Sequence, residues 1–563
     1  MARPTQIDRC NDIAWYGSRV YNKDGLSWVI RSGKAMAMAV LQPELHTTGT
    51  RLLSVWRSMR FRLLVEGMLA GLVAGLAAVA FRLMLTKAEV WRDYLLDWAR
   101  GDPARWAVAA LVLVSAGAAA GYLTGRAPET AGSGIPHVAA VLRRQRNLNW
   151  RRVLPIKVAG GVLAIGAGLS LGREGPTVQI GAAAGQMVSR ALVRPKVEEK
   201  YLVACGAGAG LAAAFNAPLA GVIFVLEELQ RNFSPYLLGT AWAASVTADL
   251  VSQYFLGPLP TFRITGLPRL PLAGLPFAAL LGAVSGLLGL AFNYALRRSL
   301  ASHDRFGDRP SAVRPLLACA LAVAMGYYLP QVLGGGHALA EAILTQKIAF
   351  ELVPLLFMAK FLLTMVSYGA GVPGGIFLPL LVLGALGGAY FGYLVAPILP
   401  GPASMEATFA VVGMAALFTA VVRAPITGIV LVIEMTGSYQ NMLPLFAACV
   451  VAYVVAEILK NPPVYEMLFE QDEAKRKTGV NRESTSLVEL VELVVEAGSR
   501  IDGRRIKDSG LPEDCLLVAV RRGNRELLPH GKTRLLSGDH VTLLAPEHRV
   551  EAIAGEFFRA PRS

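Results

Sequence analysis

The sequence predicts an all-α, polytopic membrane protein built from two related halves, with a small soluble α+β domain after them. Three observations support this fold class. The 563 residues are 54% hydrophobic and only 17% charged, with a mean hydropathy of +0.46, which is too apolar for a soluble chain of this size. Two distant apolar stretches repeat each other. The composition then changes after about residue 470, where short β-like runs replace long apolar ones.

Apolar stretches long enough to cross a bilayer recur between about residues 62 and 460. The clearest predicted spans are Glu66–Leu85, Trp106–Gly125, Pro276–Leu296 and Leu316–Gly334. Other stretches, at 153–171, 175–192 and 372–399, are short or interrupted by Gly and Pro. Broken helices persist in a membrane only where protein or a polar cavity satisfies their backbone. We therefore expect a membrane region, residues 59–470, that contains half-length helices around a functional site.

The net charge of +15 lies largely in loops and flanks, at 57–62, 143–152, 297–314 and 475–477. We interpret these clusters as topology signals and lipid-headgroup contacts rather than a nucleic-acid surface, with both termini in the cytoplasm. Residues 1–58 lack the pattern of a signal peptide and are expected to form a flexible cytoplasmic tail. Part of this tail is alternatively an overlong start, because Met36, Met38 and Met59 are other possible initiators.

The cysteines and histidines argue against metal or redox chemistry. Five cysteines are scattered without a CxxC pair, and the seven histidines do not cluster. No nucleophile–base pair or phosphate loop is present either, so we expect neither a cofactor nor an enzyme.

The internal repeat defines the two halves. FNAPLAGVIFVLEEL (215–229) aligns without gaps with VRAPITGIVLVIEMT (422–436), at an offset of 207. Upstream, GREGP (172–176) corresponds to GIFLP (375–379) at an offset of 203. Repeats of this kind often enclose a site near the bilayer midplane, where discontinuous helices meet. The alignment alone leaves open whether the repeats are inverted.

Three glycine-flanked motifs, GSGIP (132–136), GREGP (172–176) and GGIFLP (374–379), each precede an apolar helical stretch. Glycine permits close backbone approach and Pro suits the first helical turn. A helix N-terminus presents unpaired N–H groups and about half a positive charge. Three such ends that converge would bind an anion without a full positive charge, weakly enough for it to leave. The Ser133 hydroxyl and the amides of Ile376 and Phe377 are the candidate donors.

Arg173 and Glu174 place charge between apolar runs. The Glu174 carboxylate can occupy an anion position at the helix end, and its protonated form can leave, which would make a proton-dependent gate. A structural Arg173–Glu174 pair or an interfacial loop explains GREGP equally well.

The three motifs and the repeat together resemble the CLC family of chloride channels and proton-coupled chloride transporters, over about residues 60–470. The resemblance implies inverted repeats, many incompletely spanning helices, a homodimer with one pore per subunit, and chloride as the transported ion. It implies that Ser133 and Tyr465, in KNPPVYEML, coordinate the central chloride through hydroxyls, that Ile376 and Phe377 do so through amides, and that Glu174 is the gate. The supporting motif residues are Gly132, Gly134, Pro136, Gly172, Arg173, Gly175, Pro176, Gly375 and Pro379.

The choice between exchanger and channel depends on Glu228. Glu227 matches Glu434 across the repeat, which favours a shared structural role such as capping, whereas Glu228 faces Met435 in the alignment. In the family's exchangers a glutamate at this position passes protons to the cytoplasm, so the resemblance implies a Cl⁻/H⁺ antiporter. The alternative for Glu228 is a helix-end carboxylate facing water. The alternatives for the protein are a gated passive channel and a membrane sensor with vestigial transport.

Four side chains near the motifs bear on ion selectivity and local electrostatics. In the family, serine at the position of Ser133 goes with chloride preference. Lys157 matches a family position and sets the local potential, or it is an ordinary snorkelling lysine. His137 is expected to be a surface histidine with satisfied hydrogen bonds, and the alternative is a cavity-edge histidine that tunes the pH response. The same surface interpretation applies to His337, in GGGHALAE.

Residues 471–485 read as a charged linker and 486–563 as a soluble cytoplasmic domain. Its β-like runs lie at 487–498, 515–523 and 540–546, and an amphipathic helix lies at 547–558. This segment resembles the C-terminal half of the RCK (TrkA-C) regulatory module, with GSRIDGRRIKDSGLP as a strand-turn-helix and LLVAVRRGNRELLPHGKTRLLSGD as a hairpin. Such modules dimerise and often bind small ligands. The nucleotide-binding half is missing, so a dinucleotide is not expected, and an unknown regulatory ligand or simple dimer reinforcement remain alternatives.

Overall fold

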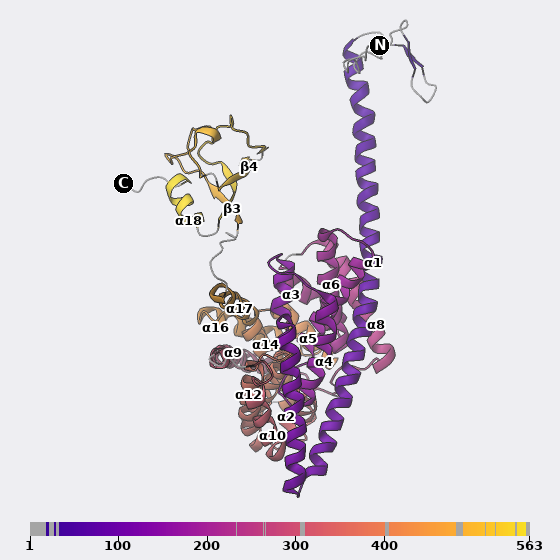
Figure 1. Cartoon of the computed structure of the whole chain (residues 1–563), viewed down its shortest axis with the longest axis vertical. Coiled ribbons are helices and arrows are strands. Elements are labelled where there is room, and N and C mark those ends of the chain that lie inside the picture. The colour runs from indigo at the N-terminus through magenta and orange to yellow at the C-terminus, as the bar shows by residue number, and fades with distance from the viewer. Residues whose placement is uncertain are drawn as a thin grey trace. The chain divides into compact units, whose positions relative to one another are not determined.

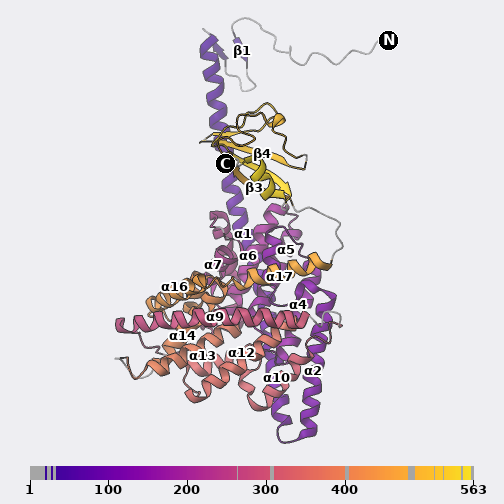
Figure 2. The same cartoon turned by 90° about the vertical axis from the view of Figure 1, so that its left-hand side faces the viewer.

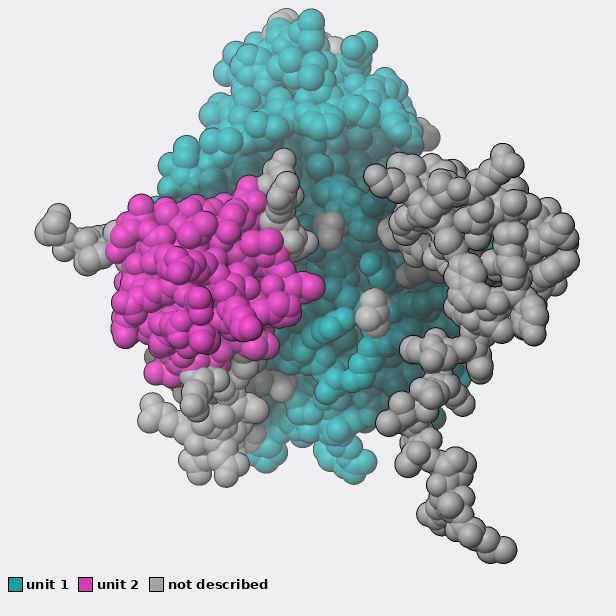
Figure 3. Space-filling model, turned by 90° about the horizontal axis from the view of Figure 1, so that it is seen from above, with its two compact units in different colours: residues 1–471 teal, residues 472–563 magenta. Residues whose placement is uncertain are grey.

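The computed structural model describes residues 19–21, 27–29, 33–231, 233–262, 264, 266–304, 310–399, 405–479, 488–512, 514–523, 525–546 and 549–558. The chain divides into two compact units, Met1–Gln471 and Asp472–Ser563, which are coloured separately in Figure 3. Each unit is described by itself.

The first unit is helical and consists of two consecutive series of helices, coloured indigo to magenta and then rose to orange in Figure 1. The first series contains α1 (Gly33–Ala99), α2 (Pro103–Arg126), α3 (Ile135–Leu142), α4 (Trp150–Gly166), α5 (Glu174–Ala191), α6 (Lys196–Phe215), α7 (Pro218–Phe224) with the π-helical turn η2 (Val225–Leu229), and α8 (Pro235–Leu256). A short hairpin, β1 (Arg19–Tyr21) and β2 (Ser27–Val29), precedes them.

The second series contains α9 (Leu275–Asp304), α10 (Leu316–Tyr328), α11 (His337–Leu344), α12 (Val353–Gly369), α13 (Phe377–Val395), α14 (Glu406–Val422), α15 (Pro425–Thr436) and α16 (Met442–Ile458), followed by α17 (Val464–Gly479). Figure 2 shows α9 running alongside α16 above α12, α13 and α14. The order of long and short helices matches between the two series, as the sequence repeat predicts. For example, α3 and α11 are both eight residues long.

Five helical segments of the described chain are long and apolar enough to cross a membrane: 61–99, 103–126, 272–304, 350–369 and 377–395. The predicted span Leu316–Gly334 is wrong as a single helix. α10 ends at Tyr328, and Pro330 opens a separate 3₁₀ turn, Pro330–Val332, because proline cannot donate the hydrogen bond that would continue the helix. The tail prediction also differs from the structure, since α1 already begins at Gly33.

Glycines let the helices nearest the site cross with their backbones in contact. A Cβ atom added at Gly206 of α6 would lie 2.3 Å from the carbonyl oxygen of Gly181 in α5. In the second half, a Cβ atom added at Gly413 of α14 would lie 2.3 Å from the carbonyl oxygen of Gly384 in α13. Gly181 and Gly384 are equivalent at the 203 offset, and Gly206 and Gly413 at the 207 offset. Only glycine fits such crossings, so both halves use the same device to bring the starts of α5 and α13 into the core.

The second unit is a small α+β domain. Its antiparallel sheet has the order β3-β6-β4-β5, with β3 (Val488–Val494), β4 (Leu516–Arg522), β5 (Arg525–Leu527) and β6 (His540–Pro546). Phe557 and Phe558, in the turn η8 (Ala554–Phe558) that follows α18 (Val550–Ile553), pack in its core with Val520 and Leu543. The β4–β5 hairpin agrees with the prediction.

The strand-turn-helix predicted for GSRIDGRRIKDSGLP is wrong. The described part of this segment contains turns, the single 3₁₀ turn Ile506–Asp508 and a bridge between Arg505 and Arg534. Gly503 and Gly510 adopt positive φ angles of 74° and 71°, which interrupt a regular helix or strand. The carboxylate of Asp502 holds the segment by accepting hydrogen bonds from the amides of Gly498 and Ser537.

Candidate anion-binding site

The three glycine motifs meet through their backbones. The Gly132 amide donates to the Val372 carbonyl (3.2 Å), and the Gly374 amide donates back to the Gly132 carbonyl (3.0 Å). Gly172 and Gly375, equivalent in the two halves, exchange hydrogen bonds of 2.6 and 2.8 Å. This reciprocal pair relates the halves by a local two-fold axis. The structure therefore brings together the predicted helix starts at Ile135, Glu174 and Phe377.

Glycine is required where these segments touch. A Cβ at Gly175 would lie 2.7 Å from the Ser133 Cβ, and a Cβ at Gly375 would lie 3.1 Å from the Gly175 amide nitrogen. Gly134, the residue before α3, has a φ of 82°, a conformation that side chains other than glycine rarely adopt. The motif glycines thus allow three helix N-termini to share one small volume.

Glu174 lies at the centre of this arrangement and has no exposed surface (0%). Neither carboxylate oxygen makes a hydrogen bond of standard geometry within the described residues, although Oε1 lies 3.7 Å from the Arg173 Nε and the backbone amide of Leu378 interacts with the carboxylate. A Cβ placed on Gly172 would lie 2.4 Å from Glu174 Oε2 and 3.1 Å from the Leu378 amide nitrogen. The Glu174 carboxylate therefore lies beside the first turn of α13, close to the backbone N–H groups at the N-terminus of that helix.

The predicted anion donors are all buried. The Ser133 hydroxyl oxygen accepts from the Ile135 amide (3.3 Å), which leaves its proton free to donate elsewhere. Ile376 and Phe377 open α13, and amides at this position have no partner within the helix. The hydroxyl of Tyr465, the second residue of α17, is buried and has no hydrogen-bond partner in the described part of the chain. Unpaired buried donors are costly unless a ligand completes them.

Two buried lysines donate hydrogen bonds to backbone carbonyls next to the site. Lys157 Nζ donates to the carbonyls of Thr130 (2.9 Å) and Gly132 (2.8 Å). Lys360, at the 203 offset, donates to those of Val332 (2.9 Å) and Gly334 (2.7 Å). Lys157 is fully buried, so the snorkelling interpretation is wrong. Each lysine satisfies carbonyls of the turn that precedes a short helix, α3 or α11.

The sequence analysis did not identify three features of this region: the buried Lys360, the helix start in GGGHALAE and the contact of Tyr368 with Ser133. Gly336 precedes α11 with a φ of 87°, as Gly134 precedes α3, and the repeated offset was the signal that could have revealed this. His337 opens α11 and stacks on Phe262 at 5.1 Å. Tyr368 accepts a hydrogen bond from the Ser133 amide at 3.5 Å, a contact that no local pattern predicts.

His137 is not on the surface, so that prediction was wrong. Its side chain lies in the core, where the ring Nδ1 is 3.0 Å from the Gln179 Nε2. The same side-chain nitrogen, Gln179 Nε2, also donates to the Glu129 carbonyl at 2.8 Å. His137 therefore links α3 to Gln179 of α5 through a buried hydrogen bond.

Glu227 and Glu434 cap each other's helices across the two halves. Glu434 accepts from the Leu219 and Ala220 amides at 3.1 and 2.8 Å, which are at the start of α7. Glu227 accepts from the Ile426 and Thr427 amides at 3.1 and 2.7 Å, at the start of α15. The shared capping role predicted from the repeat is confirmed.

Replacing Glu434 with Ala should destabilise the folded protein by about 1–3 kcal/mol, because the two amides of α7 lose their acceptor. Thermal unfolding of purified protein would measure the loss. Glu351→Ala, which removes an exposed glutamate, is the matched control and should leave the unfolding temperature unchanged. Equal unfolding temperatures for Glu434→Ala and wild type would refute the capping role.

Glu228 lies in the π-helical turn η2, an arrangement frequent at functional sites. It is only 8% exposed, which contradicts a helix-end carboxylate facing water. Charged residues surround its turn: Arg231 pairs with Glu466 of α17 at 3.5 Å, and Arg143, at the end of α3, lies over the ring of Phe469 at 5.5 Å.

The described residues contain no cluster of His, Cys, Asp and Glu side chains suited to a metal ion.

The sequence profile of the voltage-gated chloride channel family matches residues 116–457. The chain belongs to the CLC family. This is a family of multi-pass ion transport proteins, so the chain is not an enzyme. A TrkA-C domain profile matches residues 490–557.

Curated relatives of this CLC chain include proteins named H(+)/Cl(-) exchange transporter ClcA. The Citrobacter koseri protein is 37% identical over 426 residues, covering 74% of this chain and 89% of the relative. That of Vibrio parahaemolyticus is 36% identical, covering 74% and 90%. Among solved structures, a slow cyanobacterial Cl⁻/H⁺ antiporter matches with a TM-score of 0.68 and 35% identity, covering 74% of this chain and 99% of that one. A eukaryotic CLC transporter matches with a TM-score of 0.63 and 26% identity, covering 73% and 74%.

Proposed function

We propose that this CLC protein exchanges chloride for protons across the membrane. The observation that carries the proposal is the convergence of three helix starts around Glu174, a fully buried carboxylate beside the Leu378 amide at the start of α13. Helix N-termini favour negative charge without supplying a full countercharge, which suits an ion that must bind and leave. The names of the relatives, which include Cl⁻/H⁺ exchangers, support the same ion pair.

In the proposed mechanism Glu174 alternates between two states. Ionised, its carboxylate occupies the anion position beside the Leu378 amide and blocks the path. When protonated it is neutral, so the helix ends no longer hold it and chloride takes its place. Chloride in the path is coordinated by the hydroxyls of Ser133 and Tyr465 and by the amides of Ile376 and Phe377.

Glu228 supplies the cytoplasmic end of the proton path in this proposal. Its burial in the turn η2 sets it apart from Glu227, whose oxygens are occupied by helix capping. An ionisable group within a membrane protein that lacks such a structural role is a functional candidate.

Purified protein in liposomes with a chloride gradient and no proton gradient tests the exchange. With the voltage clamped near zero by a potassium ionophore, we expect chloride flow to drive protons against their gradient, recorded as a change of external pH. Chloride flux without proton movement would instead establish the passive channel. Absence of chloride flux would favour the sensor with vestigial transport.

The assembly and the C-terminal domain extend the proposal. We infer a homodimer in the plasma or inner membrane with both termini in the cytoplasm, and a TrkA-C-like domain that binds a small regulatory ligand or reinforces the dimer. Light scattering of the purified protein should give twice the chain mass, and a monomer would contradict the dimer.

Deletion of residues 482–563 tests the regulatory role of the C-terminal domain. Unaltered chloride flux and pH response in the shortened protein would contradict that role.

A further inference from the structure

The Tyr465 hydroxyl is carried into the core after a loop whose two prolines leave it few backbone donors of its own. The loop spans residues 459–463, between α16 and α17, and Tyr465 is the second residue of the helix that follows it. Pro462 and Pro463 have no N–H group to donate, and Lys460 has a positive φ of 51°. The amides of Lys460 and Asn461 donate to carbonyls at the end of α16 (2.9 and 3.0 Å). Beyond such bonds to α16, the loop is held by groups that bind the carbonyls of Asn461 and Pro462 and the Asn461 side chain.

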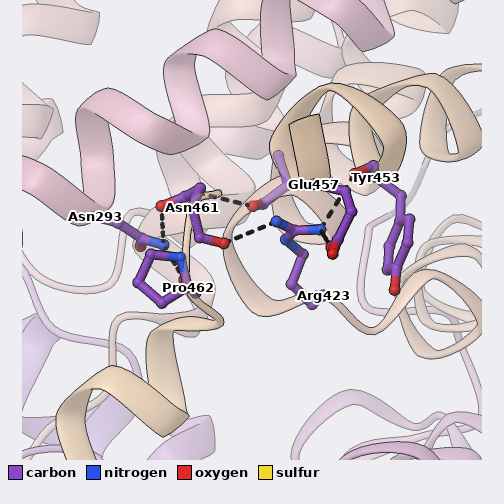
Figure 4. A network of polar contacts seen from close by, with 7 residues as sticks. Asn293, Arg423, Tyr453, Glu457, Asn461 and Pro462 are labelled. Carbon is purple, nitrogen blue, oxygen red and sulfur yellow. Dashed lines mark hydrogen bonds and ion pairs between the residues drawn. The ribbon is translucent and has the colours of Figure 1, made fainter. Parts of the chain in front are cut away.

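Two residues from other helices provide these bonds (Figure 4). Asn293 of α9 donates through Nδ2 to the Asn461 Oδ1 (3.1 Å) and to the Pro462 carbonyl (2.9 Å). Arg423, at the end of α14, donates through Nη2 to the Asn461 carbonyl (2.8 Å). Asn461 in turn donates to the Ala420 carbonyl (3.3 Å). Asn293 and Asn461 are both 2% exposed, so water does not substitute readily for these bonds.

Arg423 is itself fixed from the other side. Its Nη1 donates to the Glu457 Oε2 (2.7 Å) and the Tyr453 carbonyl (3.2 Å), and its guanidinium lies over the Tyr453 ring at 5.1 Å. The guanidinium therefore bridges α16 to the loop that follows it, as Figure 4 shows. A planar donor with five N–H groups is suited to such a bridge.

The first half contains the equivalent device in a weaker form. Asn216, at the 207 offset from Arg423, also has a positive φ (53°) and donates to the carbonyls of Gly257 (3.1 Å) and Leu259 (3.2 Å) after α8. Both halves thus use the residue at the end of one helix to hold the segment after a later helix. Only in the second half does that segment lead to a predicted anion ligand, and only there does the holding residue carry a charge.

We infer that Asn293, Arg423 and Asn461 form a clamp that positions the Tyr465 hydroxyl at the anion site. These three are positioning residues that do not touch the anion. The inference rests on the proposed function, because it assigns the clamp to an anion path through Tyr465. The clamp sets chloride affinity by holding the hydroxyl in place, so its effect disappears when that hydroxyl is absent.

A double-mutant cycle tests the clamp. Chloride binding to purified full-length protein is measured by isothermal titration calorimetry for wild type, Asn293→Ala, Asn461→Ala, Tyr465→Phe and the two double variants with Tyr465→Phe. We expect each asparagine variant to weaken chloride binding by about tenfold. The displaced Tyr465 hydroxyl would no longer donate its charge-assisted hydrogen bond to chloride. In the Tyr465→Phe background neither asparagine substitution should weaken binding further.

Asn441→Ala is the matched control. Asn441 is a buried asparagine at the other end of α16 that holds the carbonyl of Pro268 and the amide of Leu270, and it has no link to Tyr465. Its removal should lower the unfolding temperature as the other substitutions do and leave chloride affinity unchanged. Additive effects of Asn293→Ala and Tyr465→Phe, or an equal affinity loss in Asn441→Ala, would overturn the clamp. Failure of wild type to bind chloride would instead overturn the proposed function on which the clamp depends.

Discussion

Replacing Glu174 with Ala should abolish proton movement while chloride continues to cross the membrane. The substitution removes both the proposed proton carrier and a carboxylate that lies beside Gly172 and Leu378, at the proposed anion position. Chloride-driven pH changes in liposomes should fall to the level of protein-free vesicles, and chloride efflux under the same voltage clamp should persist.

The Glu174→Gln variant separates charge from volume. Glutamine keeps the size of the side chain and cannot ionise, so proton movement should be lost in this variant as well. Proton pumping that survives in either variant would contradict the role of Glu174. It would leave the structural Arg173–Glu174 pair as the explanation of GREGP.

Replacing Glu228 with Gln should also stop proton movement and leave chloride flux, for a different reason. The anion site contains none of the Glu228 atoms, so its geometry remains intact, but protons can no longer reach it from the cytoplasmic side. Chloride binding measured by calorimetry should therefore match wild type in this variant. Paired recordings of pH and chloride in liposomes measure the change in coupling.

Glu227→Gln is the matched control for Glu228. The two glutamates are neighbours on η2, but Glu227 caps α15 through the Ile426 and Thr427 amides. Its substitution should lower stability and preserve the number of protons moved per chloride. If Glu228→Gln retained full coupling, Glu228 would be a structural carboxylate. If wild type itself failed to pump protons, the passive channel would gain support instead.

The parts of the site that the sequence predicted are those with strong local signals. Glycine and proline at fixed spacing mark a helix start whatever surrounds it, and this is why the sequence identified the starts of α3, α5 and α13. The repeat added a second, independent signal, because Glu227 and Glu434 occupy the same place in each half. The reciprocal capping that they make is a consequence of the local two-fold axis.

The missed parts depend on contacts between distant segments. Lys360 reads as one lysine in an apolar helix, and its role appears only when the carbonyls of Val332 and Gly334 surround its ammonium group. His137 was expected at the surface because nothing in the local sequence reveals Gln179 beside it. The interruption after Tyr328 was overlooked because hydropathy alone carried the predicted span through Pro330.

Anomalous X-ray diffraction from crystals of the Glu174→Gln variant soaked in bromide would test the central claim most directly. We claim that the helix starts at Ile135, Glu174 and Phe377 bind the transported anion and that the Glu174 carboxylate competes for one of its positions. The predicted result is one bromide peak within contact of the Ser133 and Tyr465 hydroxyls and the Ile376 and Phe377 amides, and a second beside the Leu378 amide that is absent in the wild-type protein. Bromide peaks confined to the surface, with none between these three helix ends, would contradict the account.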